Sequence, residues 1–389
     1  MGKINIFDGN IIEGIFLSRK NRFVVECKVN NEIKFAYLPN PGRLLELLYK
    51  DVPLYLQLNE KKGCYEYTVV GVKKDDYPVM LHTHFSNKVF RYLLENRLIK
   101  DFENCRVLKE EFSIGNSRFD FLINCKMGEL LLEVKTCTLF HNDIAMFPDA
   151  VTKRGTKHLK ELAQLSKSGI RGAVIFLVQN DSVKYFLPEF NIDLVFAKTL
   201  LEVKNHVIVK AYGISWEQDL TFKQRVKELK IPWNVLKAHI NDSGSYFLIL
   251  KLEKDAHIEI GGIGNIFFKS GYYAYVGSGK KFLSRRVERH KRVRKKLFWH
   301  IDYFRTHCEY VTSFIIRTSQ DIECLLSEEL KKISNWQIQN FGCSDCKCNS
   351  HLYGFSENPL SNKSFIDLLM KYRLGAISEE IKILKDNGF

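Results

Sequence analysis

The sequence lacks the features that would place the chain in a membrane, secreted or repeat class. No stretch approaches the roughly 18 consecutive apolar residues of a membrane-spanning helix. The start, MGKINIFDGNIIEGIF, has no charged segment followed by an apolar core, so we expect no signal peptide. Internal repeats and low-complexity tracts are also missing. The ten cysteines are scattered apart from one late cluster, which predicts a reducing cytoplasm and no disulfide framework.

The chain has 389 residues, of which 45% are hydrophobic, enough for two or three domains with buried cores. Its net charge of +14 is concentrated in the segment 280–296, which holds ten Lys or Arg against one Glu. This basic segment predicts a polyanion partner, most simply nucleic acid, and the alternative is a solvated surface helix. Interleaved Leu283, Val287 and Leu297 predict a helix with one buried face. The candidate nucleic-acid contacts in this segment are Lys280, Lys281, Arg285, Arg289, Arg292, Arg294, Lys295 and Lys296.

A first domain is expected over residues 1–83, where residues 11–83 alternate short strand-like runs with turns. Five or so strands are expected, with about two helical turns in PNPGRLLELLY (39–49) after the third. That order predicts an OB-like barrel, although other small barrels fit nearly as well. Lys20 and Arg22, beside Phe23, are candidate nucleic-acid contacts on a strand face, or else exposed charges next to a core aromatic.

From residue 84 to residue 216 helical and strand patterns alternate. GAVIFLVQ (172–179) is a continuous apolar run, which predicts a central strand covered on both faces. We therefore expect an α/β layer over 84–216.

The rest of the chain divides into three expected parts. Residues 217–240 are charged and interrupted by Pro232, which predicts a helix followed by a linker. A third domain is expected over 241–353, and a helical tail over 354–389. The fold class predicted for the whole chain is a multidomain protein with α/β and β parts.

SRFDFLINCKMGELLLEVKT (117–136) places charged residues inside otherwise apolar strand segments. Unpaired charges are costly in a core, so Asp120, Glu133 and Lys135 need mutual neutralisation or a bound cation. Side chains alternate along a strand, so Glu133 and Lys135 point the same way. A hairpin that turns at Met127–Gly128 would bring Asp120 to the same edge. Neighbouring carboxylates with oxygen-only ligation favour Mg²⁺ or Mn²⁺, held by Asp120 and Glu133.

This arrangement suits hydrolysis of a phosphodiester, with Lys135 orienting or polarising the attacking water. The alternative is a surface hairpin with a Glu–Lys pair. The stretch FPDAVTKRGTKHL (147–159) adds functional groups beside it. Arg154 and Lys157 are suited to meet a phosphate, and His158 to transfer a proton or bind metal.

YLPNPGRL, GNSRFDF, LLEVKTCTL and FPDAVTKRGTKHL, in this order, closely resemble motifs of the sugar fermentation stimulation protein family, SfsA. The resemblance covers residues 7–215. It implies a DNA-binding protein associated with regulation of sugar (maltose) metabolism, built from an OB-like barrel and a PD-(D/E)XK nuclease-like core. It also places the nuclease motif on Asp120, Glu133 and Lys135, with Glu110 or Glu111 as a further acid. Nuclease folds also serve as binding modules, so cleavage does not follow from the resemblance.

DSGSYFLILKL (242–252) and GYYAYVGSGKKFLSRRVERH (271–290) resemble strands of GIY-YIG nucleases. Together with FWHIDYF and FGCSDCKCNSHLY, they resemble the GIY-YIG-related domain found attached to endonuclease III, over residues 241–353. The first motif reads GSY and departs from the usual form. The domain is therefore expected either to cleave DNA or only to grip it through the basic segment.

The GIY-YIG resemblance implies four site residues. They are Tyr246 and Tyr275, a helix arginine at Arg286 or the adjacent Arg285, and Glu323 as a metal ligand. Tyrosine hydroxyls position water and arginine stabilises a pentavalent phosphate, so the residue types suit phosphodiester hydrolysis.

CSDCKCNSH (343–351) offers a tightly spaced set of zinc ligands, Cys343, Cys346, Cys348 and His351. The alternative is a buried thiol cluster, because this spacing is not among the commonest zinc arrangements. His300 and Asp302 are either catalytic or brace this site.

These observations predict a cytoplasmic DNA-binding protein with metal-dependent phosphodiester hydrolysis, using Mg²⁺ or Mn²⁺ and, in the late cluster, zinc. Two other functions stay open: a non-catalytic DNA-binding regulator of sugar metabolism genes, and an RNA-binding or RNA-processing factor. Strong, salt-sensitive binding that leaves DNA intact would favour the regulator.

Overall fold

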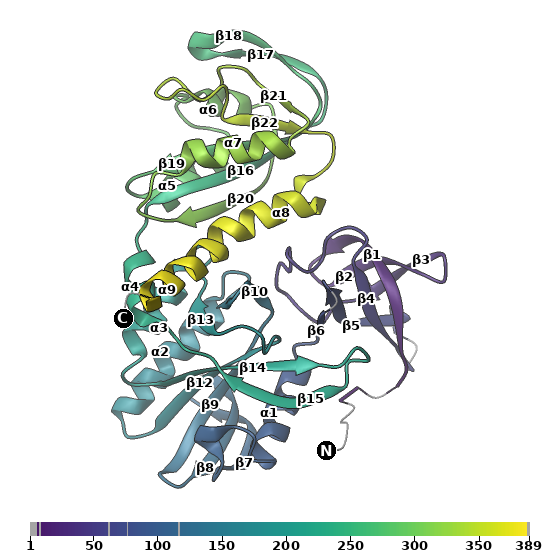
Figure 1. The fold of residues 1–389 in the computed structure, drawn as a ribbon, viewed down its shortest axis with the longest axis vertical. Coiled ribbons are helices and arrows are strands. Elements are labelled where there is room, and N and C mark those ends of the chain that lie inside the picture. The colour runs from purple at the N-terminus through teal and green to yellow at the C-terminus, as the bar shows by residue number, and fades with distance from the viewer. Residues whose placement is uncertain (1–5, 8, 61–62, 76, 116, 387–389) are drawn as a thin grey trace. The chain divides into compact units, whose positions relative to one another are not determined.

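The computed structural model describes residues 6–7, 9–60, 63–75, 77–115 and 117–386. The chain forms two compact units, called here the first unit (1–237 with 374–389) and the second unit (238–373). Their helices and strands are labelled in Figure 1. None of the helices in the described ranges combines the length and apolar character needed to cross a bilayer.

The first unit begins with a barrel. Its strands pair in the order β3-β2-β1-β4-β5-β6, and a parallel pairing between β3 and β5 closes the first five. This closure confirms the predicted OB-like barrel. The strands are β1 (Ile11–Asn21), β2 (Val24–Val29), β3 (Glu32–Tyr37), β4 (Pro53–Leu58), β5 (Tyr67–Lys74) and β6 (Tyr77–Met80).

The prediction of a helix within 39–49 is wrong, because this stretch forms only turns. The guanidinium of Arg19 donates hydrogen bonds to the backbone oxygens of Asn40, Gly42 and Arg43. Carbonyls held in this way point to a side chain and not along a helix, and Leu44 takes a φ of 54°. The segment therefore packs against the barrel as an irregular loop.

An α/β layer follows the barrel, as predicted. Its sheet has the order β15-β14-β12-β9-β8-β7, with β12 parallel to both of its neighbours. Residues of β12 alternate between two apolar clusters, with Val174 in one and Ile175 in the other, so this strand is buried on both faces. The strands are β7 (Arg106–Ile114), β8 (Ser117–Cys125), β9 (Gly128–Cys137), β12 (Arg171–Val178), β14 (Ile208–Trp216) and β15 (Phe222–Glu228).

Helices and a small second sheet complete the first unit (Figure 1). Helix α1 contributes Phe90 to one apolar cluster, and α2 and α3 contribute Leu162 and Phe196 to the other. The small sheet has the order β10-β11-β13. The remaining elements are α1 (Phe85–Glu95), η1 (Lys100–Phe102), β10 (Leu139–His141), β11 (Ile144–Phe147), α2 (Lys153–Lys167), β13 (Tyr185–Pro188), α3 (Leu194–Val203), α4 (Trp233–His239) and α9 (Ala376–Asp386).

Two expectations for this region fail. Residues 217–240 were expected to be helix and linker, but β15 lies within them and pairs antiparallel with β14 before α4 begins. Cys105 and Cys125, expected to be free thiols, are joined by a disulfide. They flank the paired residues Arg106 and Asn124 of β7 and β8, so the strand register sets them opposite each other.

The second unit is built on a five-stranded antiparallel sheet of order β20-β16-β19-β22-β21, with a separate β17–β18 hairpin. Helix α5 contacts β16 and β19, and α7 contacts β19 and α8. The elements are β16 (Gly244–Leu252), β17 (Ala256–Ile260), η2 (Gly261–Ile263), β18 (Gly264–Phe268), β19 (Gly271–Gly279), α5 (Leu283–Lys291), α6 (His300–Arg305), β20 (Glu309–Arg317), α7 (Glu323–Ile333), β21 (Trp336–Gln337), β22 (Leu352–Phe355), η3 (Pro359–Ser361), α8 (Lys363–Met370) and η4 (Lys371–Gly375).

The predicted basic helix is shorter than the basic segment. Helix α5 buries Leu283 and Val287 as expected, but it ends at Lys291. Leu297 lies beyond the helix and is only partly buried. The residues from 292 to 299 are irregular, so half of the basic segment is a loop.

The buried carboxyl of Glu46 in the irregular loop generates a stability prediction. Burial, together with the neighbouring Asp149, raises the pKa of Glu46 to about 8, and Glu46 Oε1 has no hydrogen-bond partner among the described residues. The folded state therefore keeps a proton that the unfolded chain has lost, and stability falls as pH rises from about 5 to about 8. The Tm of the wild type should therefore fall between about pH 5 and about pH 8. We expect Glu46→Gln to reduce this fall by several degrees, since 1 kcal/mol corresponds to about 2–4 °C in a domain of this size.

Thermal unfolding of the full chain at both pH values measures this effect. Glu13→Gln, at an exposed position on β1, is the matched control and should leave the pH dependence unchanged. Equal pH dependence in the wild type and Glu46→Gln would contradict the protonated state.

Candidate active site

The predicted hairpin is present and carries Asp120 to the end of its paired region. The pairing of β8 with β9 runs from Cys125 and Gly128 to Phe121 and Leu132. Immediately beyond it, Val134 N donates to Asp120 Oδ2 at 2.7 Å. The other oxygen, Oδ1, accepts a hydrogen bond from Asn87 Nδ2 of α1 at 2.9 Å. The carboxylate is thereby fixed where the two strands stop pairing.

Glu133 is buried on β9, and its two carboxylate oxygens have different surroundings. Lys135 Nζ contacts Oε1, and His158 Nδ1 of α2 lies 2.7 Å from the same atom. The second oxygen, Oε2, is buried and has no hydrogen-bond partner among the described residues. A buried carboxylate oxygen without a partner is costly. It is therefore the atom of this group that is best suited to receive a cation.

The surroundings shift the pKa values of the two acids in opposite directions. Burial raises the pKa of Asp120, and the negative charge of Glu133 raises it further. Burial would also raise the pKa of Glu133, but the hydrogen bond with His158 and the charge of Lys135 outweigh it and lower the pKa. A nearby cation would favour ionisation of Asp120.

Asp120, Glu133 and Lys135 line one cavity of about 790 Å³ within the first unit. Basic side chains line it too: Arg22, Arg118, Lys153 and Arg154. Carboxylates suited to a hard cation, with guanidinium and ammonium groups nearby, form a set that can hold a phosphate next to a metal.

His158 does not line this cavity, although it was predicted to transfer a proton or bind metal there. It contacts Glu133 from helix α2 and lines a separate, smaller cavity of about 410 Å³ together with Arg154 and Lys157. Its Nε2 is 3.4 Å from Arg154 Nε. His158 therefore contacts Glu133 from outside the cavity that Asp120 and Lys135 line.

Of the two alternative further acids, only Glu111 lines the larger cavity, where its carboxylate pairs with Arg118 at 2.9 Å. Glu110 pairs instead with Arg91 at 2.6 Å. The strand register separates them, because adjacent residues on β7 point in different directions.

The sequence analysis missed Asp149, which also lines the larger cavity. It is half-buried, and its Oδ2 accepts a hydrogen bond from Leu44 N at 2.5 Å. Burial raises the pKa of Asp149 to about 6. Asp149 belongs to the FPDAV motif, so the sequence did contain a signal for it. The interpretation of that stretch considered only the basic residues that follow.

The two candidate contacts on the barrel differ. Arg22 lines the cavity, whereas Lys20 lies outside it and pairs with Glu26 at 2.9 Å. The aromatic rings of Phe23 and Tyr37 are exposed and lie 6.5 Å apart. Exposed aromatic rings next to cations are typical of surfaces that bind single-stranded nucleic acid.

In the second unit, the four residues that the GIY-YIG resemblance implied lie near one another. The rings of Tyr246 and Tyr275 are 6.3 Å apart, and the charges of Arg286 and Glu323 influence both tyrosines. Burial raises the pKa of both tyrosines above the ordinary value. Sequence analysis missed His290, whose Nε2 lies 2.9 Å from the Tyr246 hydroxyl.

Asp302 organises the end of helix α5. It is buried, and Arg289 donates two hydrogen bonds of 2.9 Å to its carboxylate, while Lys295 Nζ lies 2.8 Å from it. Burial would raise the pKa of Asp302, but the neighbouring imidazole of His290 and the contacts with Arg289 and Lys295 lower it well below its ordinary value. Asp302 therefore braces the basic segment. Arg289 and Lys295, predicted to contact nucleic acid, are directed to this carboxylate instead.

Six other basic residues of the segment, all of them predicted nucleic-acid contacts, remain on the surface. They are Lys280, Lys281, Arg285, Arg292, Arg294 and Lys296, all exposed. His300 Nδ1 accepts a hydrogen bond from Gly342 N at 3.2 Å, which ties α6 to the cysteine-rich loop.

The predicted zinc quartet is wrong in one member. Cys346, Cys348 and His351 do gather, but the fourth residue in the group is Cys324 of α7 and not Cys343. Cys343 forms the turn that opens the loop, with its carbonyl accepting from Cys346 N at 3.4 Å. The spacing of one loop suggested four local ligands, whereas the fold supplies one ligand from a helix 22 residues before Cys346.

Models of known families match three parts of the chain. The SfsA N-terminal OB domain matches residues 17–81, and the sugar fermentation stimulation protein RE domain matches residues 84–219. Residues 245–374 match a domain of unknown function, DUF123.

Relatives and a solved structure match the first half of the chain. The sugar fermentation stimulation protein homolog of Clostridium kluyveri is 38% identical over 213 residues, which is 53% of this chain and 91% of the relative. The homolog of Methanothermobacter thermautotrophicus is 35% identical over 193 residues, covering 49% of this chain and 80% of the relative. The structure of Pyrococcus furiosus SfsA in complex with Ca²⁺ is similar with a TM-score of 0.53 and 30% identity, covering 57% of this chain and 96% of that one.

The bracing role of Asp302 can be tested by its removal. Asp302→Ala leaves Arg289 and Lys295 without their partner, and breaking a buried pair from one side costs about 3–5 kcal/mol. We expect urea unfolding of the full chain to show the second unit destabilised by this order. Glu288→Ala, which removes an exposed ion pair with Lys291, should cost less than about 1 kcal/mol. Unchanged stability in Asp302→Ala with tighter DNA binding would contradict the bracing role.

Proposed function

The chain belongs to the sugar fermentation stimulation protein family, and from that premise we propose that its first unit is a divalent-metal-dependent nuclease that acts on DNA. The family's RE domain spans residues 84–219, which include Asp120, Glu133 and Lys135. The reaction is hydrolysis of a phosphodiester bond in the cavity that these three residues line.

The partnerless Oε2 of Glu133 is the observation that carries the proposal. This atom and the carboxylate of Asp120 are oxygen ligands of the kind that hard cations such as Mg²⁺ and Mn²⁺ prefer. A relative, Pyrococcus furiosus SfsA, was solved in complex with Ca²⁺, another hard cation with oxygen ligands. Asp120 and Glu133 would hold the metal, which when bound lowers the pKa of water and offsets phosphate charge.

The protein side chains divide the remaining tasks. Lys135, which contacts Glu133 Oε1, places an ammonium beside the reacting phosphate. His158 holds Glu133 in one orientation from behind. Arg22, Arg118 and Arg154 line the same cavity, and we assign them to the phosphates of the DNA backbone. The exposed rings of Phe23 and Tyr37 offer stacking surface for unpaired bases.

We propose a binding role for the second unit and assign it no cleavage. Both carboxylate oxygens of Glu323 are occupied: Oε1 lies 3.0 Å from His351 Nδ1, and Oε2 accepts from the Ser278 hydroxyl. A carboxylate used in this way is poorly placed to ligate a catalytic cation. The exposed part of the basic segment supplies sequence-independent contacts to phosphates.

A second candidate function is a DNA-binding regulator that does not cleave. The pairing of Glu133 Oε1 with both Lys135 and His158 favours it, because the ammonium of Lys135 already offsets the charge of the carboxylate and His158 occupies the same oxygen. This candidate predicts tight, salt-sensitive binding and intact DNA whatever metal is supplied. An RNA-specific role would appear as preferential competition by RNA in the same binding assay.

The nuclease proposal predicts metal-dependent cleavage that depends on Glu133. Full-length protein is incubated with supercoiled, linear and single-stranded DNA in Mg²⁺, Mn²⁺ or EDTA. We expect cleavage with either metal and none with EDTA. Glu133→Gln and Asp120→Asn should each lower the rate more than about 100-fold, as expected when a preorganised electrostatic contact is lost.

Glu129→Gln is the matched control, since Glu129 is an exposed acid on the same strand, and it should cleave at the wild-type rate. Glu323→Ala should also retain cleavage, which separates the two units. Failure of the wild type to cut any of these substrates, with binding retained, would overturn the proposal in favour of the regulator.

A further inference from the structure

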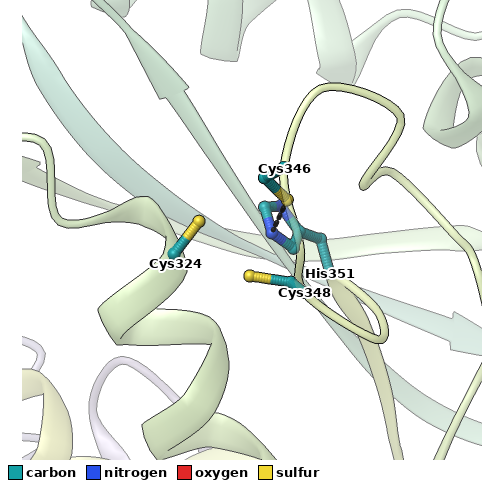
Figure 2. A group of neighbouring side chains, drawn as sticks. All are labelled: Cys324, Cys346, Cys348 and His351. Atoms are coloured by element: carbon teal, nitrogen blue, oxygen red, sulfur yellow. Dashed lines mark hydrogen bonds between the residues drawn. The ribbon is translucent and has the colours of Figure 1, made fainter.

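Three thiols and one imidazole converge in the second unit. Figure 2 shows Cys324 on helix α7, with Cys346, Cys348 and His351 on the loop that faces its first turn. The ligand atoms of the four residues all lie within 4.8 Å of one another. The sulfur of Cys346 is 3.5 Å from His351 Nε2. Four ligands at about 2.0–2.3 Å from a tetrahedral zinc stand roughly 3.5–4 Å apart, so the group needs only small adjustments to close around one ion.

The chemistry of the four ligands selects the metal. Three thiolates and one imidazole form a closed Cys₃His set, which is typical of structural zinc. Soft sulfur ligands disfavour Mg²⁺ and Ca²⁺, the cations suited to the carboxylates of the first unit. The set leaves no open coordination position for substrate, so the site is structural.

The orientation of His351 is fixed from its far side. Its Nδ1 lies 3.0 Å from Glu323 Oε1, which directs Nε2 toward the thiols. Glu323 is held in turn by the hydroxyl of Ser278. Metal-binding histidines usually have such a carboxylate partner, which fixes the tautomer and strengthens the ligand. An isolated thiol cluster would have no need of it.

Helix α7 contributes in a second way. Glu323 and Cys324 are its first two residues, and the helix is 11 residues long. The same helix turn therefore supplies one ligand and the group that orients another.

We propose that the second unit binds one structural Zn²⁺ through Cys324, Cys346, Cys348 and His351, with Glu323 as a positioning residue. The ion fastens the loop between Gln337 of β21 and Leu352 of β22 to helix α7. It also fixes the chain His351–Glu323–Ser278, and Arg286 donates to Ser278 O at 2.7 Å. Zinc thus helps to hold Arg286 in place. This inference does not depend on the nuclease proposal.

Two cysteine variants test the assignment. Each removes one thiol from the second unit, but only Cys324→Ser is expected to lose zinc. Full-length protein is expressed in zinc-supplemented medium, dialysed against a weak chelator, and its zinc is measured by mass spectrometry. Wild type and Cys343→Ser should each hold about one zinc per chain. Cys324→Ser should lose most of it. Replacement of zinc by Co²⁺ should give thiolate charge-transfer bands in wild type and Cys343→Ser that weaken in Cys324→Ser.

Glu323→Gln provides a second, milder test that does not remove a ligand. It should weaken zinc affinity by about 10–100-fold, measured by competition with a chromogenic chelator, while the fold by circular dichroism is retained. Zinc lost from Cys343→Ser but kept by Cys324→Ser would overturn the assignment. Absence of zinc from reconstituted wild type, or a disulfide among these cysteines under reducing conditions, would overturn it as well.

Discussion

The buried carboxylate of Glu133 is the interaction on which the first unit's site depends. An ionised group in that position is tolerated because Lys135 and His158 both approach one of its oxygens. The other oxygen is left without a protein partner among the described residues. The difference between the two oxygens gives the carboxylate a direction: one side is anchored to the fold, and the other is available to a ligand. Asp120, held by a backbone N–H of the same strand, completes the pair.

The features that could be predicted from the sequence are those set by the regular alternation of side chains along a strand. The spacing of Glu133 and Lys135 on one strand, and the turn at Met127–Gly128, were enough to bring Asp120 to Glu133, because pairing in a hairpin follows from register. The double-sided burial of β12 also followed from its unbroken apolar run. In each case the deciding information lay within one or two adjacent segments.

The features that escaped prediction depend on partners far away in the chain. The loop after β3 stays irregular because Arg19 binds its carbonyls. Arg289 and Lys295 bind the buried carboxylate of Asp302 and are therefore not free on the surface. Cys324 replaces Cys343 in the thiol group because α7 packs beside the late loop. Charge runs and cysteine spacings report the local chain, whereas these outcomes were decided by tertiary packing.

One apolar cluster of the first unit includes Leu54 and Val69 of the barrel together with Phe176 and Phe196 of the α/β layer. The barrel and the layer are therefore not two independently melting modules, since separating them would expose a continuous hydrophobic surface. They should unfold as one cooperative transition. A truncation made at their boundary would yield aggregating fragments, so dissecting this half of the protein requires point substitutions in the intact chain.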